Sequence, residues 1–299
     1  MQAGLYLAHK PVGQTSFSLV LAMIEEIRLS GLRPDKLPVC HGGALDPFAE
    51  GLMLLLAGQT TRLMELLHPI PKTYVAQVRW GAETDNGDLL GRVVAEGDPA
   101  ALTPAQLDLA LPAFLGFQEQ VPPNTSNKRV DGERAYAKAH RGEEFVLPPS
   151  RVYLHAARFT AHALPRESTL ELTCRGGYYV RSLARDLGRA LGCRAHLGAL
   201  RRTAIGPWSD PGPGVRVHLR GPQLLPWCPS RAVSVAEEKA LRAFKPIGRG
   251  AINPPDWPLP AGFPDPQAPV RALTPAGLIA LLREDGLLLA AAPLLKGPI

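Results

Sequence analysis

The chain has 299 residues, four cysteines and a formal net charge of +6, and 45% of its residues are hydrophobic. This length accommodates one large domain and a smaller one. The absence of any C-x-x-C pair argues against a structural zinc site or a disulfide framework. The sequence has neither the pattern of a signal peptide nor a run of about 20 apolar residues, so we expect a cytoplasmic protein that contacts no membrane and binds no metal.

The first predicted element is a short strand over residues 5–8, which leads into a turn at Gly13. Ser16 is expected to cap a helix, because apolar residues follow it at helical spacing. The residues predicted to form the buried face of this helix are Phe17, Val20, Leu21, Ile24 and Ile27. Gly31 and Pro34 are expected to end it.

The central part of the chain reads as strands with three helices between them. A buried strand is predicted over residues 52–57, with a short helix after it that ends at Leu67. Residues 73–80 alternate strictly between two faces, which is typical of a strand. Thr103, followed by Pro104 and Gln106, forms a capping box that opens a helix to about residue 115. Further elements are predicted as paired strands over residues 151–164 and 168–174 and as a helix over residues 180–191.

The helix predicted over residues 180–191 has two distinct faces. One is a leucine stripe that we expect to be buried, consisting of Leu183, Leu187 and Leu191. The other repeats arginine every four residues and would usually lie in solvent, with Arg181, Arg185 and Arg189. Arg181 is the exception, because a cation at the start of a helix opposes the helix dipole and needs compensation. A carboxylate is the natural candidate.

Positive charge is concentrated in one part of the chain. Residues 128–202 contain 15 Lys and Arg against 7 Asp and Glu, a net +8, so the remainder carries −2. Within this region, residues 121–144 have few apolar anchors, and we expect them to become ordered on binding. Such a concentration favours a polyanionic partner, although a solvated, salt-bridged surface would give the same count.

The end of the chain differs in composition. Residues 207–269 contain 14 prolines, too many for a continuous sheet or helix, and only residues 235–243 read as a helix. Three short apolar runs close the sequence, at residues 270–273, 277–282 and 286–291. They predict a small β module.

The candidate catalytic residue is Asp46, in the sequence C-H-G-G-A-L-D-P-F-A-E-G of residues 40–51. Pro47 disfavours the α region for Asp46, so this carboxylate is expected on an extended or turn backbone. The glycines allow close approach of another chain or a ligand. Taken alone, the stretch is explained better by an ordinary Asp-Pro turn than by a catalytic site.

This block resembles the H-[ST]-G-x-L-D-P signature of the tRNA pseudouridine-55 synthases, the TruB family. Four more blocks match in the same order, namely K-P-V-G-Q-T-S from Lys10, K-T-Y from Lys72, G-x-E-T-D-x-x-D from Gly81 and C-R-G-G-Y-Y-V-R-S-L-A-R-D-L-G from Cys174. The resemblance covers residues 5–205 and, more loosely, the tail. One departure is Gly42, where the family has Thr or Ser, and it leaves a hydroxyl unaccounted for.

The resemblance implies an α+β fold in which a mixed or antiparallel sheet is flanked by helices. A catalytic domain over residues 1–209 would include an RNA-contacting insert around residues 121–150. Residues 210–299 would form a Pro-rich connection and a small PUA-like RNA-binding domain. The implied activity is that of an isomerase, an intramolecular transferase that converts the T-loop uridine at position 55 of tRNA to pseudouridine. It would need no cofactor, bind the T-stem-loop and act as a monomer.

The resemblance also assigns roles to individual residues. Asp46 would be the nucleophile, and whether it attacks the ring, attacks C1′ or takes a sugar proton stays open. Tyr74 would stack on the uracil where the C5 proton leaves, and Arg181 would pair with Asp46 and keep it ionised. Tyr179 and Leu200 would line the pocket.

The remaining predicted site residues contact the RNA. His41 would fill the space that the target base leaves when it flips out of its loop. Arg201 and Arg202 are expected to meet phosphates. The insert would contribute three basic side chains: Lys128, Arg129 and Arg134.

Three other functions fit parts of this pattern. A glycosidase-type hydrolase also uses an Asp near C1′, but it generally needs a second carboxylate as acid. A tRNA-folding protein would use the same RNA-binding surfaces, with catalysis secondary or absent. A guide-RNA-dependent synthase acting on ribosomal RNA shares the L-D-P block, but the basic insert favours the stand-alone tRNA enzyme.

Overall fold

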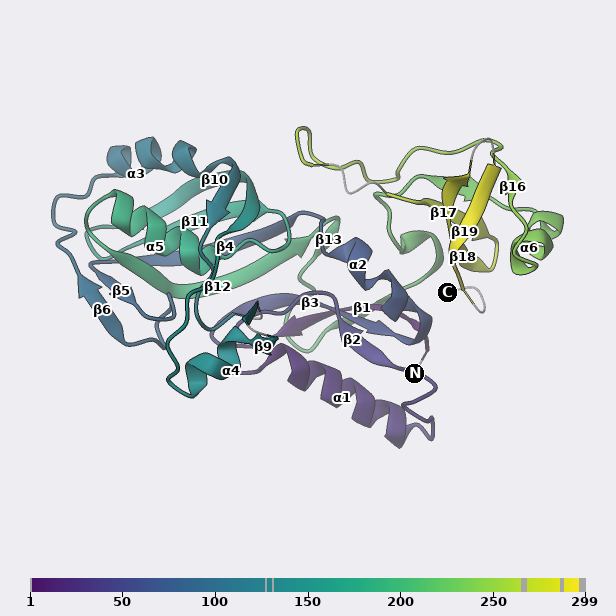
Figure 1. Ribbon diagram of the computed structural model, residues 1–299, viewed down its shortest axis with the longest axis horizontal. Coiled ribbons are helices and arrows are strands. Elements are labelled where there is room, and N and C mark those ends of the chain that lie inside the picture. The colour runs from purple at the N-terminus through teal and green to yellow at the C-terminus, as the bar shows by residue number, and fades with distance from the viewer. Residues whose placement is uncertain (1, 127, 131, 265–267, 286–287, 296–299) are drawn as a thin grey trace. The chain divides into compact units, whose positions relative to one another are not determined.

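The computed structural model describes residues 2–126, 128–130, 132–264, 268–285 and 288–295 (Figure 1). Positions 127 and 131 of the predicted insert and 286–287 of the last predicted strand lie outside these ranges. The chain divides into two compact units. Unit 1 comprises Met1–Asp46, Gly51–Ile70 and Ile205–Ile299, and unit 2 comprises Pro47–Glu50 and Pro71–Ala204.

The first part of unit 1 is an antiparallel sheet with strands in the order β14, β1, β3, β2. Its strands are β1 (Gly4–Lys10), β2 (Val39–His41), β3 (Glu50–Ala57) and β14 (Arg216–Leu219). The short strand β13 (Trp208–Ser209) also belongs to this unit. Its helices are α1 (Ser16–Leu29), η1 (Gly58–Leu63), α2 (Met64–Leu67) and η3 (Gly221–Gln223). Strand β14 lies beyond residue 209 yet pairs with β1, so the tail contributes directly to the N-terminal sheet.

Helix α1 covers one face of this sheet, and of the residues predicted for its buried face Val20 and Ile27 are buried and Ile24 is partly buried. Its buried positions are Ser16, Val20, Met23 and Ile27. Phe17 is 56% exposed and Leu21 is 51% exposed, so the prediction that they belong to the core was wrong. The centre of the buried face is Met23, which packs in one cluster with Tyr6 and Leu55 of the sheet and was not among the predicted residues.

The helix also begins one residue earlier than the sequence suggested. Thr15 is the N-cap, and its side chain accepts a hydrogen bond from the backbone N–H of Ser18. Ser16 is therefore inside the first turn, and its hydroxyl is available for a different partner.

The rest of unit 1 is a small five-stranded sheet with strands in the order β15, β17, β18, β19, β16, as the apolar runs predicted. The elements are β15 (Ser230–Ala232), α6 (Val235–Arg242), β16 (Ile247–Gly248), β17 (Val270–Thr274), β18 (Gly277–Asp285) and β19 (Leu288–Leu294). Strands β15 and β17 run parallel and the other pairs antiparallel.

A single arginine holds the proline-rich connection of unit 1 in place. Arg271 on β17 is fully buried and donates hydrogen bonds to the carbonyl oxygens of Cys228, Pro222 and Leu224, at 3.0, 2.8 and 3.1 Å. It also pairs with the carboxylate of Asp256. These acceptors satisfy a charge that would be costly to bury alone.

Unit 2 is built on a second row of strands in the order β12, β4, β11, β10, β7. They are β4 (Lys72–Trp80), β7 (Gly116–Gln120), β10 (Ser150–Ala163), β11 (Glu167–Cys174) and β12 (Ala195–Ile205). Two hairpins accompany them, β5 (Ala82–Thr84) with β6 (Val93–Glu96) and β8 (Arg129–Val130) with β9 (Glu133–Arg134). The helices are α3 (Pro104–Ala110), η2 (Leu111–Phe114), α4 (Ala135–His140) and α5 (Val180–Ala190).

The sequence patterns of unit 2 are confirmed in detail. Residues 74, 76, 78 and 80 of β4 are buried, as their alternation predicted, and β10 pairs with β11. The capping box at Thr103 is present, although the helix turns into the 3₁₀ segment η2 after Ala110. The predicted α+β class, with a mixed or antiparallel sheet flanked by helices, is confirmed.

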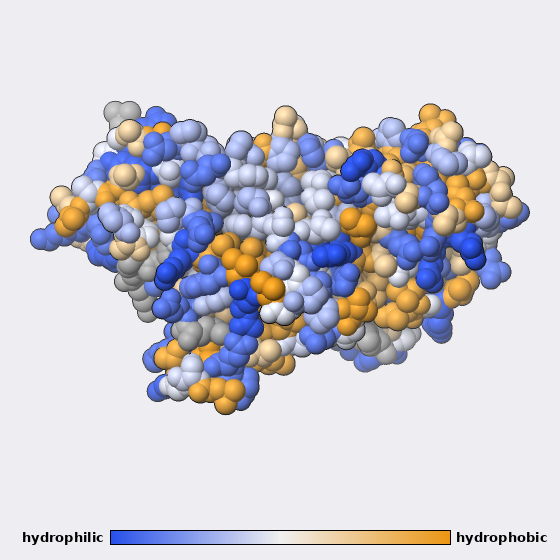
Figure 2. All heavy atoms as spheres, turned by 180° about the vertical axis from the view of Figure 1, so that it is seen from behind, coloured by the Kyte–Doolittle hydropathy of each residue, from blue (hydrophilic) through white to orange (hydrophobic). Residues whose placement is uncertain are grey.

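The surface carries scattered apolar side chains. On the face drawn in Figure 2, hydrophobic residues form separate patches between hydrophilic ones. Several large apolar side chains are more than half exposed, among them Phe17, Leu90, Val146 and Phe244. Within the described residues, no helix has the length and apolar character that a transmembrane helix requires.

The two faces of α1 provide a test of the packing. Met23 is fully buried whereas Phe17 is 56% exposed. We expect Met23→Ala to lower the free energy of unfolding by about 2–4 kcal/mol, because truncation leaves a cavity. Phe17→Ala should cost less than about 1 kcal/mol. Chemical denaturation of both variants would measure this, and equal losses would contradict the assignment of the buried face.

Candidate active site

Asp46 lies in the loop between β2 and β3 and is partly exposed. The loop is held at its start by the backbone N–H of Gly42, which donates to the carbonyl oxygen of Leu54 at 2.8 Å. It is held again at Leu45, which precedes the carboxylate. The Ser16 hydroxyl accepts from the Leu45 N–H at 2.8 Å and donates to the Leu45 carbonyl at 3.0 Å. The Leu45 N–H and the Leu45 carbonyl belong to consecutive peptide groups, so Ser16 holds the two peptides that directly precede Asp46.

The block of residues 10–16 supports this loop. Lys10 is fully buried, and its Nζ donates to the carbonyl oxygens of Pro11 and Gln14, at 2.9 and 2.8 Å. These bonds close the turn that carries the chain from β1 into α1. Because that turn sets the position of Ser16, the two sequence blocks form one structural element. The sequence showed both blocks, but no signal in it connects Ser16 with Leu45.

Packing explains the glycine at position 42. A Cβ there would lie 3.1 Å from Leu54 Cβ, 3.3 Å from Leu67 Cδ1 and 3.4 Å from Leu56 Cδ1. These separations are tighter than ordinary van der Waals contacts, and the three leucines belong to the core of unit 1. The leucines therefore occupy the space that a Thr or Ser side chain would need.

The other residues predicted to surround the base belong to unit 2, except His41. Tyr74 is the third residue of β4 and is 8% exposed, and Leu200 on β12 is 6% exposed. His41 is the last residue of β2 in unit 1 and is partly exposed. Asp46 belongs to unit 1 and Arg181 to unit 2, so their predicted pairing stays a prediction.

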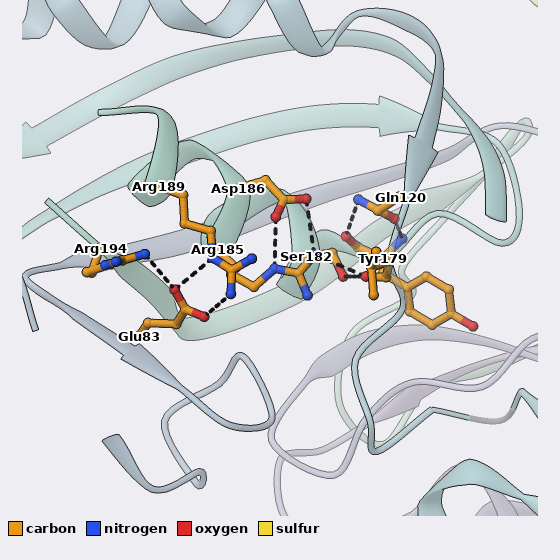
Figure 3. A network of polar contacts seen from close by, with 9 residues as sticks. Glu83, Gln120, Tyr179, Ser182, Arg185, Asp186, Arg189 and Arg194 are labelled. Atoms are coloured by element: carbon orange, nitrogen blue, oxygen red, sulfur yellow. Dashed lines mark hydrogen bonds and ion pairs between the residues drawn. The ribbon is translucent and has the colours of Figure 1, made fainter. Parts of the chain in front are cut away.

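Tyr179 precedes α5 and is fixed through its backbone. The buried side chain of Gln120 donates to the Tyr179 carbonyl oxygen at 3.0 Å and accepts from the Tyr179 N–H at 2.9 Å. Figure 3 shows the Tyr179 ring extending away from these bonds. Gln120 thus fixes the backbone of Tyr179. Gln120 was not among the predicted site residues, because it lies between the helix predicted to end near residue 115 and the insert predicted from residue 121.

Arg181 at the start of α5 is buried and has several acceptors. Its Nη1 donates to the Asn86 carbonyl oxygen at 2.8 Å and to Thr125 Oγ1 at 2.7 Å, and lies 3.8 Å from Asp88 Oδ2. The predicted compensating carboxylate therefore exists within unit 2. It is Asp88, the last residue of the block that begins at Gly81. This acidic partner offsets the unfavourable position of a cation at a helix N-terminus.

The other two arginines of the row are also paired (Figure 3), and of these Arg189 is exposed, as expected for a solvated face, whereas Arg185 is partly buried. Arg189 Nε donates to Glu83 at 2.9 Å, and this hydrogen bond holds the pKa of Glu83 below its usual value. Arg194 lies 3.5 Å from the same carboxylate. Arg185 pairs with Asp186 at 2.8 Å. Helix α5 is thus tied to the block of residues 81–88 at both ends.

The predicted RNA-contacting side chains differ in accessibility. Lys128, Arg129 and Arg134 are exposed, on and beside the β8–β9 hairpin. Arg201 is exposed, but Arg202 is only 1% exposed, because successive residues of β12 point to opposite faces. In this structure only the first of the two adjacent arginines is accessible to a phosphate.

Lys72 is an additional titratable group near Tyr74. It is buried on the same side of β4, two residues away, and faces Cys174 on the neighbouring strand. Burial, with a smaller contribution from Arg202, lowers the Lys72 pKa to about 7. Burial also raises the pKa of the Cys174 thiol to about 12. Among the described residues, no group of three His, Cys, Asp or Glu side chains could hold a metal ion.

The hydrogen bonds of Ser16 provide the first test of the site. Ser16→Ala removes the acceptor of the Leu45 N–H and the donor to the Leu45 carbonyl oxygen, and both bonds are buried. The free energy of unfolding should fall by about 1–3 kcal/mol. Native-state hydrogen exchange should show faster exchange at the Leu45 amide. Unchanged exchange at Leu45 would mean that Ser16 does not fix the loop.

The lowered pKa of Lys72 predicts a dependence of stability on pH. Between about pH 7 and pH 10 the unfolded chain binds a proton at Lys72 that the folded chain has lost, so stability should rise with pH. Lys72→Met should flatten this rise by about 2 kcal/mol between pH 7 and pH 9. Denaturation at both pH values would measure it. Equal slopes for the variant and the parent would show that Lys72 titrates normally.

Two family models match consecutive parts of the chain. Residues 33–180 match the N-terminal domain of the TruB family pseudouridylate synthases. Residues 181–218 match the C-terminal domain of tRNA pseudouridylate synthase B. A Leifsonia xyli protein named tRNA pseudouridine synthase B is 36% identical over 297 residues, which cover 95% of this chain and 93% of that protein. An Arthrobacter protein of the same name is 40% identical over 216 residues, covering 70% of this chain and 68% of that one.

Solved structures show the same fold at low identity. A chain in the structure of an H/ACA RNP bound to a substrate RNA containing 2′-deoxyuridine has a TM-score of 0.66 and 18% identity, covering 97% of this chain and 84% of that chain. A chain of an archaeal box H/ACA sRNP complex has a TM-score of 0.61 and 17% identity, covering 98% and 86%. With family models over residues 33–218 and a relative matched along nearly its whole length, the chain belongs to the TruB family of pseudouridylate synthases.

Proposed function

We propose that this protein is a tRNA pseudouridine synthase that isomerises the T-loop uridine at position 55, with Asp46 as nucleophile and without a cofactor. The relatives named tRNA pseudouridine synthase B support tRNA as the substrate. The observation that carries the catalytic assignment is the loop of residues 42–49, which fixes the peptide before Asp46 and leaves this carboxylate partly exposed.

The chemistry explains why a carboxylate suffices. The C1′–N1 bond of uridine breaks, the ring turns, and a C1′–C5 bond forms. C5 loses its proton to solvent and N1 gains one, so the isomerisation consumes no oxidant and imports no group. A nucleophilic or basic carboxylate can start this sequence. A water-excluding pocket then has to retain the detached base.

Side chains of unit 2 are suited to the other roles. The guanidinium of Arg181, held by fixed acceptors, would keep Asp46 ionised. Tyr74 would stack on the uracil and assist removal of the C5 proton. Tyr179 and Leu200 would line the pocket, and His41 would fill the place of the flipped base.

Binding of the tRNA T-stem-loop would use the exposed cations. Lys128, Arg129 and Arg134 are positioned on one hairpin, and Arg201 is exposed on β12. We further propose that residues 1–209 act as the catalytic domain and residues 210–299 as a PUA-like RNA-binding domain. The protein would act as a cytoplasmic monomer.

Substitution of Asp46 provides the central test. Asp46→Asn keeps the shape of the side chain and removes its charge and nearly all of its nucleophilicity. Release of tritium from C5-labelled uridine in a tRNA transcript should fall to background, a loss of at least about 10³-fold. The affinity for tRNA should stay within about threefold of the parent.

Two controls identify the substrate. The first control is a transcript with cytidine in place of uridine 55. The tritium that the parent transcript releases from position 55 should be absent from this transcript. Phe17→Ala, which changes an exposed residue of α1, should leave the rate unchanged. Near-parental tritium release by Asp46→Asn would overturn the mechanism. Release from a ribosomal RNA fragment but not from tRNA would point to the related ribosomal enzyme instead.

A further inference from the structure

The segment at the start of the predicted insert is fastened to the first turn of α5. Gln120 binds the Tyr179 backbone, as described above. The Ser182 hydroxyl donates to the Val121 carbonyl oxygen at 2.8 Å, and Arg185 Nη2 donates to the same oxygen at 3.1 Å. The path of the chain from β7 into the insert is therefore defined by polar contacts with α5, some of which are drawn in Figure 3.

Thr125 continues this series and reaches the guanidinium of Arg181 itself. Thr125 Oγ1 accepts from Arg181 Nη1 at 2.7 Å, and the Thr125 carbonyl oxygen accepts from Nη2 at 3.3 Å. One residue thus contacts both terminal nitrogens of the guanidinium. Two acceptors on one residue define the orientation of a planar group better than either would alone.

Asn86 and Asp88 contact the same guanidinium in different ways. Nη1 has two hydrogens, and one is directed to the Asn86 carbonyl oxygen at 2.8 Å. The second goes to Thr125 Oγ1. Asp88 Oδ2, at 3.8 Å from Nη1, is beyond hydrogen-bond distance and acts through its charge. A buried N–H that loses its acceptor is costly, so the guanidinium would turn to find another partner if the threonine hydroxyl were absent.

We propose that Thr125 is a positioning residue for the reaction, which orients the Arg181 guanidinium and links that orientation to the RNA-binding insert. The proposal rests on the function proposed above, in which Arg181 acts on Asp46. Lys128 follows Thr125 by three residues and is exposed, and the Lys128 carbonyl accepts from the Ala135 N–H at 2.7 Å. An RNA phosphate held by Lys128 or Arg129 would therefore restrain the segment that carries Thr125.

The test compares Thr125→Val, which keeps the shape and removes the acceptor, with Thr125→Ser, which keeps the hydroxyl. For Thr125→Val we expect the single-turnover rate of tritium release from tRNA to fall about tenfold or more, with affinity for tRNA within about twofold of the parent. Thr125→Ser should stay within about threefold of the parental rate. Thr160→Val, at an exposed threonine of β10, is the matched control and should not change either quantity.

A second measurement separates positioning from a general structural role. If Thr125 acts through Arg181, then Thr125→Val should add little to the defect of Arg181→Lys, because both remove the same oriented contact. The proposal would be overturned if the rate loss of the double variant equalled the product of the losses of the two single variants. A Thr125→Val rate within twofold of the parent would also overturn it. If Thr125→Val does not fold, Thr125→Ala, which keeps the backbone contact, replaces it in both comparisons. A parent chain that releases no tritium from tRNA would instead refute the proposed function.

Discussion

Burial of the Arg181 guanidinium is the constraint on which much of unit 2 depends. A buried cation at the N-terminus of a helix faces both a desolvation cost and the positive end of the dipole. Unit 2 meets that demand from two distant segments: Asn86 after β5 and Thr125 after β7 accept hydrogen bonds, and Asp88 contributes its charge. Gly87 packs closely against Arg181. A Cβ added at Gly87 would lie 3.1 Å from the Arg181 Cβ. The need to satisfy one side chain therefore fixes two loops.

Unit 1 carries the candidate carboxylate, Asp46, on a loop whose backbone is held by hydrogen bonds. Loops generally carry function because a rigid scaffold positions them. Here the scaffold consists of the pairing of β1 with β3, the turn closed by Lys10, and the Ser16 hydroxyl on the Leu45 peptide. The leucines packed around Gly42 hold the other end of the loop. Sequence blocks that are far apart in the chain thus serve a single local geometry.

Several features followed directly from local sequence patterns. Strand β4 and the leucines at positions 183 and 187 were recognisable because periodicity depends only on which side of an element is buried. The capping box at Thr103 was recognisable because its hydrogen bonds form within four residues. The same reasoning succeeded only in part for α1, where Val20 and Ile27 are buried but Phe17 and Leu21 are exposed. Periodicity identified an apolar surface there, but the choice between Phe17 and Met23 as core residue depends on the sheet that packs against the helix.

The sequence by itself determined the family resemblance, the α+β class and the identity of the candidate nucleophile, because motifs and periodicity are properties of neighbouring residues. Only the tertiary structure decided which partners hold those residues. The acceptors of Arg181, the bond between Ser16 and Leu45, and the burial of Arg202 each join segments that are tens of residues apart or depend on which face of a strand is covered. Such pairings have no local signature, since any polar side chain of the right length satisfies a buried donor once the fold has brought it within reach.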